Sequence, residues 1–415
     1  MTPSAERHPE ARRPLGECGG ALALVCSVFF VNLSSRAVLA PLMPAVERDL
    51  GIGHGQAGSL FLLLSVGYCV GLLGSGFVSA RLTHHVTISL SSLAVGGVLV
   101  GLAASRGLAG LWAGTAALGA VAGLYLPSGV ATVTALVAPR DWGKALAIHE
   151  LAPNLALTVA PLAAEGLLGW TSWRGALGIF GVAALSVGAG FALMGRGGRF
   201  RGEEPSRRAV GALASSPRFW VLLLLFALGL AATIGLYAVL PLYLTAGLGL
   251  PRGDANRLVA ASRACGLVTV LAAGWLSDRL GPRRAMASVL AASGAATLWL
   301  AAVPAAWVAP AVIVQAIPGA WFFPAAFAAL ARVGPLAVAF SVPLAMVLGG
   351  GVVPAVVGLL GERGSFGGGI ALVGALMLLG AGLALGLREE SKDSTAGAVP
   401  LEPSPSPAKE PERHG

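Results

Sequence analysis

Long apolar runs alternate with short polar gaps along almost the whole chain, and the charged residues are concentrated in the gaps. The runs hold about 20 to 30 residues each, and an α-helix needs about 20 apolar residues to cross a bilayer. The pattern therefore predicts about twelve transmembrane helices. The expected helices span residues 19–43, 56–80, 86–104, 108–137, 145–168, 175–194, 219–244, 255–277, 284–302, 306–333, 336–360 and 366–387.

A longer polar gap divides these runs into two sets of six. We expect the sets to form two bundles, residues 19–194 and 219–387, joined by a loop at 195–218. Six arginines and a short length are typical of a linker on one side of a membrane rather than of a domain. Residues 1–18 and 388–415 are polar and rich in Pro and Glu, which predicts disordered tails.

Composition supports a membrane protein. The 415 residues are 56% hydrophobic and 11% charged, whereas a soluble domain has about 25% charged residues. The net charge of +9 could suggest a nucleic-acid-binding protein, but of the 28 Lys and Arg, 20 fall in the tails and in loops on one side, and only six on the other. This asymmetry is a topology signal. It predicts a multi-pass protein of the cell inner (plasma) membrane, with both termini in the cytoplasm and no nucleic-acid partner.

The chain shows no sequence motif for catalysis or for a bound cofactor. A phosphate loop, paired zinc ligands and a nucleophile elbow are all missing from the sequence, and the spacing of the four cysteines makes no metal motif. We therefore expect a protein that is not an enzyme and that needs no cofactor or metal.

The gap between the eighth and ninth runs carries the most specific motif. It reads GWLSDRLGPRR from Gly274 to Arg284. Gly274 and Gly281 allow a tight turn between two helices, and Asp278 can sit against the positive end of a neighbouring helix. Three basic residues can hold the turn in the cytoplasm. These are Arg279, Arg283 and Arg284.

A degenerate copy of this motif lies in the first half. It starts at Gly76, 198 residues before Gly274, and has Ala80 in place of the aspartate and Thr83 in place of the second glycine. Prolines repeat at similar distances. The pairs are Pro41 with Pro241, and Pro127 with Pro324. The repeats predict two duplicated halves related by an axis along the membrane normal.

The motif at 274–284 resembles the signature loop of the major facilitator superfamily, G-x-L-a-D-r-x-G-r-R, except that Pro282 stands where that family often has a basic residue. The resemblance covers nearly the whole chain outside the tails. It implies an all-α membrane fold of two six-helix bundles related by pseudo-two-fold symmetry, which rock around a central site. It also implies that Asp278 approaches the cytoplasmic start of the fifth helix, near Arg140 to Lys144.

Two arginines lie inside expected helices. Arg36 is about 15 residues, or roughly 22 Å, into the first helix, and Arg263 lies about 12 Å into the eighth from the outside. A charge at the bilayer centre costs at least about 2.5–3.5 kcal/mol, and neither arginine has an acidic neighbour one turn away in its helix. We therefore expect both to bind an anionic substrate, because guanidinium grips a carboxylate bidentately. In the alternative, each arginine bonds to backbone carbonyls and serves packing alone. Neutral hydrogen bonds to the substrate are expected from Asn32, Asn154, Tyr237 and Gln315.

The fifth helix carries a polar stripe. At 100° per residue, its members fall within roughly 80° of one another. They are Glu150, Asn154, Thr158, Pro161 and Glu165. We expect Glu150 to exchange a proton, since an apolar environment favours the neutral acid, with assistance from His149; the alternative is a permanent ion pair. Glu165 lies near the outer end, where it can simply reach water.

The predicted function is a secondary active transporter of a small organic anion such as a carboxylate, moved together with protons. The first alternative is a proton-driven drug or metabolite exporter, although Ala160-Pro161 lacks the glycine that antiporters of the resembled family carry before this proline. The second alternative is a membrane receptor that does not transport. The expected partners are a small-molecule substrate, protons and the lipid bilayer, and we expect a monomer.

Overall fold

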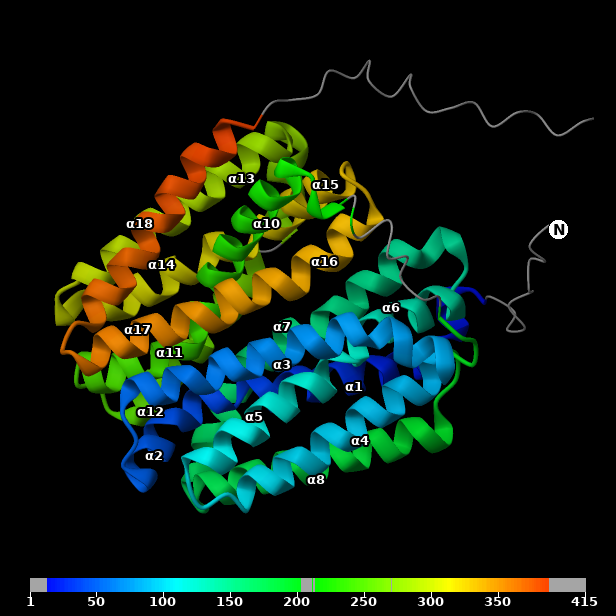
Figure 1. Ribbon diagram of the computed structural model, residues 1–415, viewed down its shortest axis with the longest axis horizontal. Helices are drawn as coiled ribbons and strands as arrows, with labels where there is room; N and C mark the ends of the chain where they lie inside the picture. Colours follow the sequence, from blue (N-terminus) through cyan, green and yellow to red (C-terminus); the bar gives the residue numbers. More distant parts are fainter. Residues whose placement is uncertain (1–12, 203–210, 212, 270, 388–415) are drawn as a thin grey trace, which may run out of the picture.

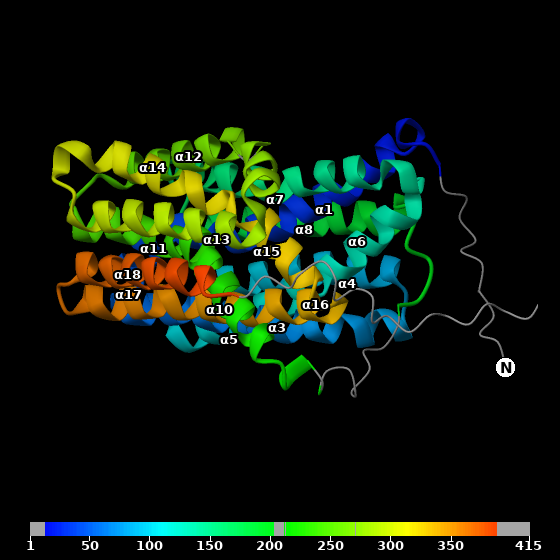
Figure 2. The same ribbon diagram turned by 90° about the horizontal axis from the view of Figure 1, so that it is seen from above.

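The computed structural model describes residues 13–202, 211, 213–269 and 271–387. Within these residues it is built of helices that run along one common direction, as Figures 1 and 2 show. Eleven of the helical segments are long and apolar enough to cross a membrane. The predicted all-α membrane fold is confirmed.

The first half fills mainly the lower right of Figure 1. Its helices are α1 (Gly19–Ala37), α2 (Leu39–Leu50), α3 (His54–Arg81), α4 (His84–Ala103), α5 (Leu108–Gly123), α6 (Tyr125–Leu136), α7 (Trp142–Leu168) and α8 (Trp173–Met194). Breaks at Val38 and Leu124 divide the expected first and fourth helices into α1–α2 and α5–α6. Glu47, Arg48 and Asp49 fall in the gap expected between the first two helices, but they form the last turn of α2.

The second half fills mainly the upper left of Figure 1. Its helices are α10 (Pro217–Leu230), α11 (Leu236–Leu242), α12 (Arg252–Thr269), α13 (Leu271–Ala302), α14 (Val308–Ala320), α15 (Phe322–Ala331), α16 (Pro335–Ala345), α17 (Val353–Glu362) and α18 (Phe366–Leu385). Three π-helical segments interrupt these helices. They are Ala231–Gly235, Tyr243–Gly247 and Met346–Val352. The expected eighth span begins as α12, which is not among the eleven apolar segments because its 18 residues include four charged ones.

The helices define two ends of the molecule. At the terminal end lie residues 13–18, the α3–α4 connection, the segment after α8 and the end of α18. At the distal end lie the connections at 51–53, 104–107, 169–172 and 248–251, and the turn between α17 and α18. Both described chain ends thus lie at the same end of the molecule.

Glycines allow the close packing of α3 against α5. A Cβ added at Gly71 would overlap the Ala120 carbonyl oxygen, and one added at Gly119 would overlap the Leu64 carbonyl oxygen. Helices in lipid associate through such close backbone approach, since lipid is as apolar as the side chains. The high glycine content of the sequence is explained in part by this contact.

The signature motif makes the predicted turn. Gly281 has φ +73° and interrupts α13, with Pro282 directly after it. An L side chain is strained at this φ, so glycine suits the position. Arg279 and Arg284 are exposed, and Arg283 donates through Nη1 to the Leu387 carbonyl oxygen at 3.1 Å.

The side chains of residues 271–278, which include the predicted gating residues Gly274 and Asp278, lie outside the described part. The approach of Asp278 to the start of α7 stays a prediction.

Part of the expected N-terminal tail has a fixed place. The Arg13 N–H donates to the Leu136 carbonyl at 3.2 Å, and the Ala138 N–H donates to the Arg13 carbonyl at 2.9 Å. The prediction of disorder is therefore wrong for residues 13–18, because these bonds satisfy backbone groups left over where α6 ends. Residues 1–12 and 388–415 lie outside the described part of the chain.

The start of the central loop is also docked. Its residues bond to the α3–α4 connection: the His85 N–H donates to the Gly198 carbonyl at 2.7 Å, and the His84 N–H donates to the Phe200 carbonyl at 3.1 Å. The segment at 195–202 therefore covers the degenerate motif copy. Residues 203–210 and 212 of the loop lie outside the described part.

Candidate functional site

A small cavity of about 50 Å³ lies between the two halves, where the breaks and π-helical segments interrupt the long helices. Residues of α1, α2, α3 and α7 line one side, and residues of α11 and two π-helical segments line the other. The lining is Leu33, Arg36, Ala37, Ala40, Phe61, Leu64, Ser65, Tyr68, Leu157, Ile234, Tyr237, Ala238, Met346 and Gly350. The wall is thus apolar except for one cation, two phenols and a hydroxyl group.

Arg36 is held by neutral groups of the first half. Its side chain is buried, and Nη2 donates to Asn32 Oδ1 at 3.4 Å. The guanidinium carbon lies 4.2 Å from the centre of the Tyr68 ring, a cation–π contact. Asn32 Nδ2 donates to the Ala122 carbonyl at 3.1 Å, which turns Oδ1 toward the arginine. Arg36 and Asn32, predicted together from the sequence, are together in the structure.

Arg263 is the second buried arginine and lies in the second half. It is buried on α12, with its guanidinium carbon 5.1 Å from the centre of the Tyr237 ring. Its Nε and Nη2 atoms have no hydrogen-bond partner. Tyr237 separates Arg263 from the cavity and donates its hydroxyl to the Ala37 carbonyl of the first half at 3.3 Å. Neither Arg36 nor Arg263 forms an ion pair with any carboxylate in the described part of the chain.

Two other predicted binding residues lie apart from the cavity lining. Gln315 on α14 is fully buried and donates to the Ala232 carbonyl at 3.0 Å, while its Oε1 has no partner. Asn154 donates to the Glu150 carbonyl in its own helix at 2.8 Å. These contacts hold local backbone and bring neither amide into the cavity wall.

The predicted proton pair lies at the boundary between protein surface and interior. The Glu150 side chain is 57% exposed at the protein surface, and its exchange of a proton stays a prediction. The adjacent His149 is fully buried, with Nδ1 at 3.7 Å from Glu150 Oε1. It points away from the stripe, because successive residues differ by 100° on a helix, and it packs on Phe29 and Tyr125.

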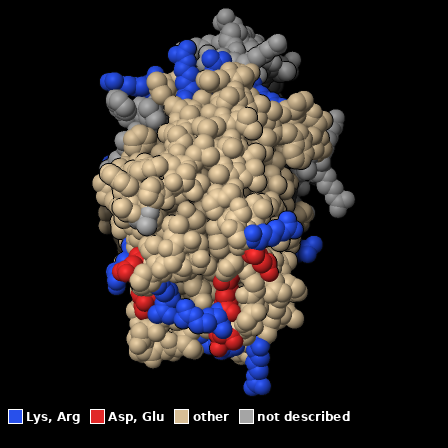
Figure 3. Space-filling model, turned by 90° about the vertical axis from the view of Figure 1, so that its left-hand side faces the viewer, with Lys and Arg blue, Asp and Glu red and all other residues tan. Residues whose placement is uncertain are grey.

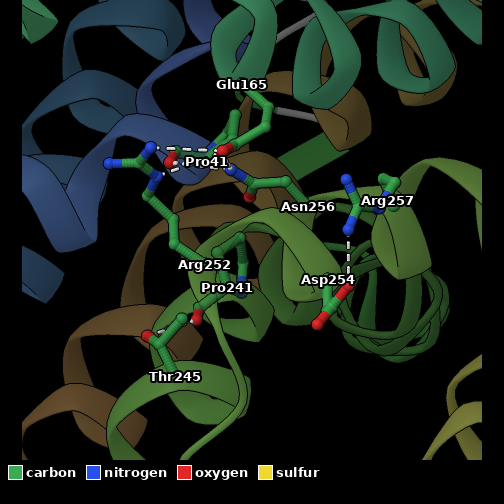
Figure 4. A network of polar contacts seen from close by, with 8 residues as sticks. All are labelled: Pro41, Glu165, Pro241, Thr245, Arg252, Asp254, Asn256 and Arg257. Carbon is green, nitrogen blue, oxygen red and sulfur yellow. Dashed lines mark hydrogen bonds and ion pairs between the residues drawn. The ribbon is translucent and has the colours of Figure 1, made fainter. Parts of the chain in front are cut away.

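The polar stripe of α7 faces the second half. Leu157, 20° from Glu150 on the helical wheel, lines the cavity. Glu165, farther along the stripe, crosses to α12, where its carboxylate receives hydrogen bonds from Arg252 Nε at 3.0 Å and Nη2 at 3.1 Å. Asn256 Nδ2 donates to the same carboxylate at 3.0 Å and lies 3.5 Å from the Pro41 carbonyl oxygen (Figure 4). Glu165 therefore links the halves rather than simply reaching water.

A second carboxylate crosses in the opposite direction. Glu362 of α17 accepts a hydrogen bond from the Gly55 N–H of α3 at 3.1 Å. The first N–H groups of a helix lack partners within the helix and attract negative charge, so Glu362 stabilises the start of α3 from the other half. Both crossing contacts are at the distal end, where acidic and basic side chains are interleaved on the lower part of the face in Figure 3. The two halves are therefore closed against each other at this end.

Sequence reasoning missed Arg252, Asn256 and Glu362. Arg252 and Glu362 fall in gaps between apolar runs, where charged residues are ordinary, and their partners are 87 and 307 residues away. Of the three residues, only Asn256 could have been identified from the sequence. It lies near the end of an expected transmembrane segment, where a polar side chain needs a partner, and it is fully buried in the structure.

Comparison with known proteins gives both the family and the fold. The family model described as Major Facilitator Superfamily matches residues 25–267. A chloramphenicol resistance protein of Streptomyces lividans is 30% identical over 266 residues, which cover 59% of this chain and 64% of that protein, less than two thirds of its length.

Among solved structures, a bacterial homologue of the human lysosomal transporter Spinster, inward-facing and unoccupied, is 14% identical with a TM-score of 0.76, covering 90% of this chain and 97% of that one. The peptide transporter POT in complex with sulfate is 15% identical with a TM-score of 0.71, covering 88% of this chain and 94% of that one. These likenesses show the fold, and the family match covers more than half of the sequence. The chain belongs to the Major Facilitator Superfamily of membrane transporters.

Proposed function

We propose that this protein is a secondary active transporter that moves a small amphipathic organic anion, such as a carboxylate, coupled to protons. The observation that carries the proposal is the pair Arg36 and Arg263, one from each half. Arg36 lines the cavity and Arg263 lies behind Tyr237 in its wall, and both meet only neutral groups. A guanidinium keeps its charge at any working pH, and an uncompensated buried charge is costly. An anion entering the cavity relieves that cost.

The cavity also suits the apolar part of such a substrate. Its wall is mostly aliphatic, with Phe61 from one half and Met346 from the other. The substrate class is therefore a carboxylate with an apolar body rather than a strongly hydrated ion.

The two ends support alternating access. The distal end is closed by Glu165 and Glu362, whereas Glu150 is more than half exposed two turns from Leu157 toward the terminal end. Arginines dominate the terminal end, which by the positive-inside rule is cytoplasmic. We infer an inward-facing state in a plasma membrane. The moving units are residues 19–194 and 219–387, joined by 195–218, and the transporter acts as a monomer.

Drug export is a second candidate function. The relative from Streptomyces lividans is named a chloramphenicol resistance protein, and the apolar lining of the cavity fits a neutral aromatic compound as well. Export of this kind does not require an anionic group, so it predicts that the two buried arginines are unimportant for substrate affinity.

Uptake into proteoliposomes distinguishes the candidates. The probes are radiolabelled benzoate and short aliphatic carboxylates, chloramphenicol, and the cationic dye ethidium, each with and without a pH gradient. We expect gradient-driven accumulation of at least one carboxylate. Accumulation of chloramphenicol or ethidium alone would favour the exporter, and binding without accumulation of any probe would indicate a receptor.

Charge-preserving variants then test the site. Arg36→Lys and Arg263→Lys keep the charge but lose the bidentate fork, so carboxylate affinity is expected to fall while the protein still inserts. Arg106→Lys, at an exposed position of the distal end, is the matched control and leaves affinity unchanged. Unchanged affinity in both buried variants would contradict the proposal.

A further inference from the structure

We propose that His149, rather than Glu150, takes up the coupled proton, at its Nδ1 atom, and that Glu150 is the counter-charge that the protonated ring then holds. The inference rests on the proposed function for its coupling role. It starts, however, from the hydrogen positions that the heavy atoms around His149 require, which do not depend on any substrate.

The two neighbours of the Tyr125 phenol fix the position of its hydrogen. Its phenolic oxygen lies 2.9 Å from the Val25 carbonyl oxygen and 2.9 Å from His149 Nε2. Two oxygens at 2.9 Å need a hydrogen between them, and the carbonyl has none to give, so the phenol donates to Val25. The phenol has a single hydrogen. Its contact with His149 therefore requires the imidazole Nε2 to donate.

The other ring nitrogen of His149 is left without a hydrogen. With the hydrogen on Nε2, the neutral ring has a bare lone pair at Nδ1. This atom is buried without a hydrogen-bond partner, and the nearest charged group is Glu150 Oε1 at 3.7 Å. Two acceptors thus face each other across a gap that contains no hydrogen. A proton on Nδ1 would replace this repulsion by an attraction between opposite charges 3.7 Å apart.

The surroundings hold the ring in this orientation. Phe29 of α1 stacks on the imidazole with ring centres 4.5 Å apart, and Tyr125 of α6 stacks from 6.0 Å. The titratable groups that face the site are Tyr125, Cys26 of α1, whose sulfur lies 3.9 Å from the Ile148 carbonyl oxygen, and Glu150 of α7 itself. Only Glu150 among them carries a charge near neutral pH. Protonation therefore changes the pair from a net charge of −1 to zero.

Neutralisation of the pair links the proton to the rocking motion. Glu150 is exposed while the terminal end is open, and it lies on the face of α7 that carries the cavity-lining Leu157. Closing this end brings that face against the second half, and an ionised carboxylate without a partner resists desolvation. A proton on His149 supplies the partner, so closure and proton binding favour each other.

Transport assays separate the two residues. His149→Gln retains an N–H donor for Tyr125 but binds no proton, so counterflow exchange of the accumulated carboxylate is expected to persist while accumulation driven by a pH gradient is lost. Glu150→Gln leaves the proton site but removes its counter-charge, and is expected to weaken gradient-driven accumulation without abolishing it. Gradient-driven accumulation that survives in His149→Gln and is lost in Glu150→Gln would overturn the proposal.

A spectroscopic test works without any substrate. The sequence contains six histidines, and ¹⁵N-histidine labelling of the full chain in nanodiscs resolves their ring nitrogens, with His149→Gln assigning the His149 signals. We expect a neutral ring protonated at Nε2 that gains a proton at Nδ1 as pH falls, and a loss of the fixed tautomer in Tyr125→Phe. A neutral ring protonated at Nδ1, or a ring that gains no proton as the pH falls, would refute the inference. Absence of carboxylate counterflow in the unaltered protein would instead refute the proposed function.

Discussion

Replacing Glu165 by Gln should open the distal end of the transporter. The carboxylate of Glu165 receives two hydrogen bonds from Arg252 and one from Asn256, and these bonds join the two halves. The amide keeps the shape and the capacity to accept but removes the charge. Arg252 is left without its counter-ion in the closed state, whereas water can solvate it when the halves separate.

The magnitude follows from geometry and exposure. Hydrogen bonds to charged groups contribute about 1.5–3 kcal/mol each when buried, and fully exposed ion pairs contribute about 0.2–1 kcal/mol. The two side chains are 23% and 28% exposed and the contact is bidentate, so about 1.5 kcal/mol is a reasonable net value between these limits. The ratio of distal-open to distal-closed molecules should then rise about tenfold, since 1.4 kcal/mol is a factor of ten.

Electron–electron double resonance measures the distance between two spin labels and can therefore follow the ratio of distal-open to distal-closed molecules. Labels at Arg106 and Trp307, both exposed and in different halves, report on the distal end in a background without the native cysteines. Asp254→Asn is the matched control, because its ion pair with Arg257 lies within α12 and joins no two halves (Figure 4). The exchanged pair Glu165→Arg with Arg252→Glu should restore the closed population. A Glu165→Gln variant that matches the control, or an exchanged pair that stays as open as the single variants, would refute the reasoning.

Three further substitutions have expected outcomes. Glu362→Gln should open the distal end less than Glu165→Gln does, by about 0.5–1 kcal/mol in the same distance measurement, because one backbone N–H and a helix terminus are involved rather than a bidentate pair. Gly71→Val should lower the melting temperature in detergent sharply, and Gly74→Val, where a Cβ meets nothing within 4 Å, should not; equal effects would contradict the packing account. Gly281→Ala should cost about 1 kcal/mol of stability, because alanine at φ +73° is strained, and an unchanged melting curve would argue against the turn.

The sequence was sufficient for the helices and for part of the site. Apolar runs of membrane length identify transmembrane segments, since lipid offers backbone groups no other partner, and Gly281 marked its turn because few residues tolerate positive φ. The free-energy cost of placing a charge in a bilayer identified Arg36 and Arg263 as candidate site residues before any contact was known. The proximity of Asn32 to Arg36 followed from helical spacing alone.

The rest depended on how the helices pack. Local sequence gives no indication that Glu165 meets Arg252, 87 residues away, because partner choice is set by which helix faces are in contact. The same applies to the surface exposure of Glu150, since burial in a transporter depends on how the two halves are placed. The docking of Arg13 at the end of α6 is similarly non-local.

The central claim is that Arg36 and Arg263 together bind an anionic group, and its most direct test is an equilibrium binding measurement. The affinity of the most strongly accumulated carboxylate is compared with that of its uncharged amide, in the unaltered protein and in Arg36→Gln and Arg263→Gln. We predict that the unaltered protein prefers the acid by about tenfold or more, as expected for a charge-assisted contact of about 1.5–3 kcal/mol, and that each variant loses most of this preference. An unaltered protein that binds acid and amide equally, or a preference that survives in both variants, would contradict the account.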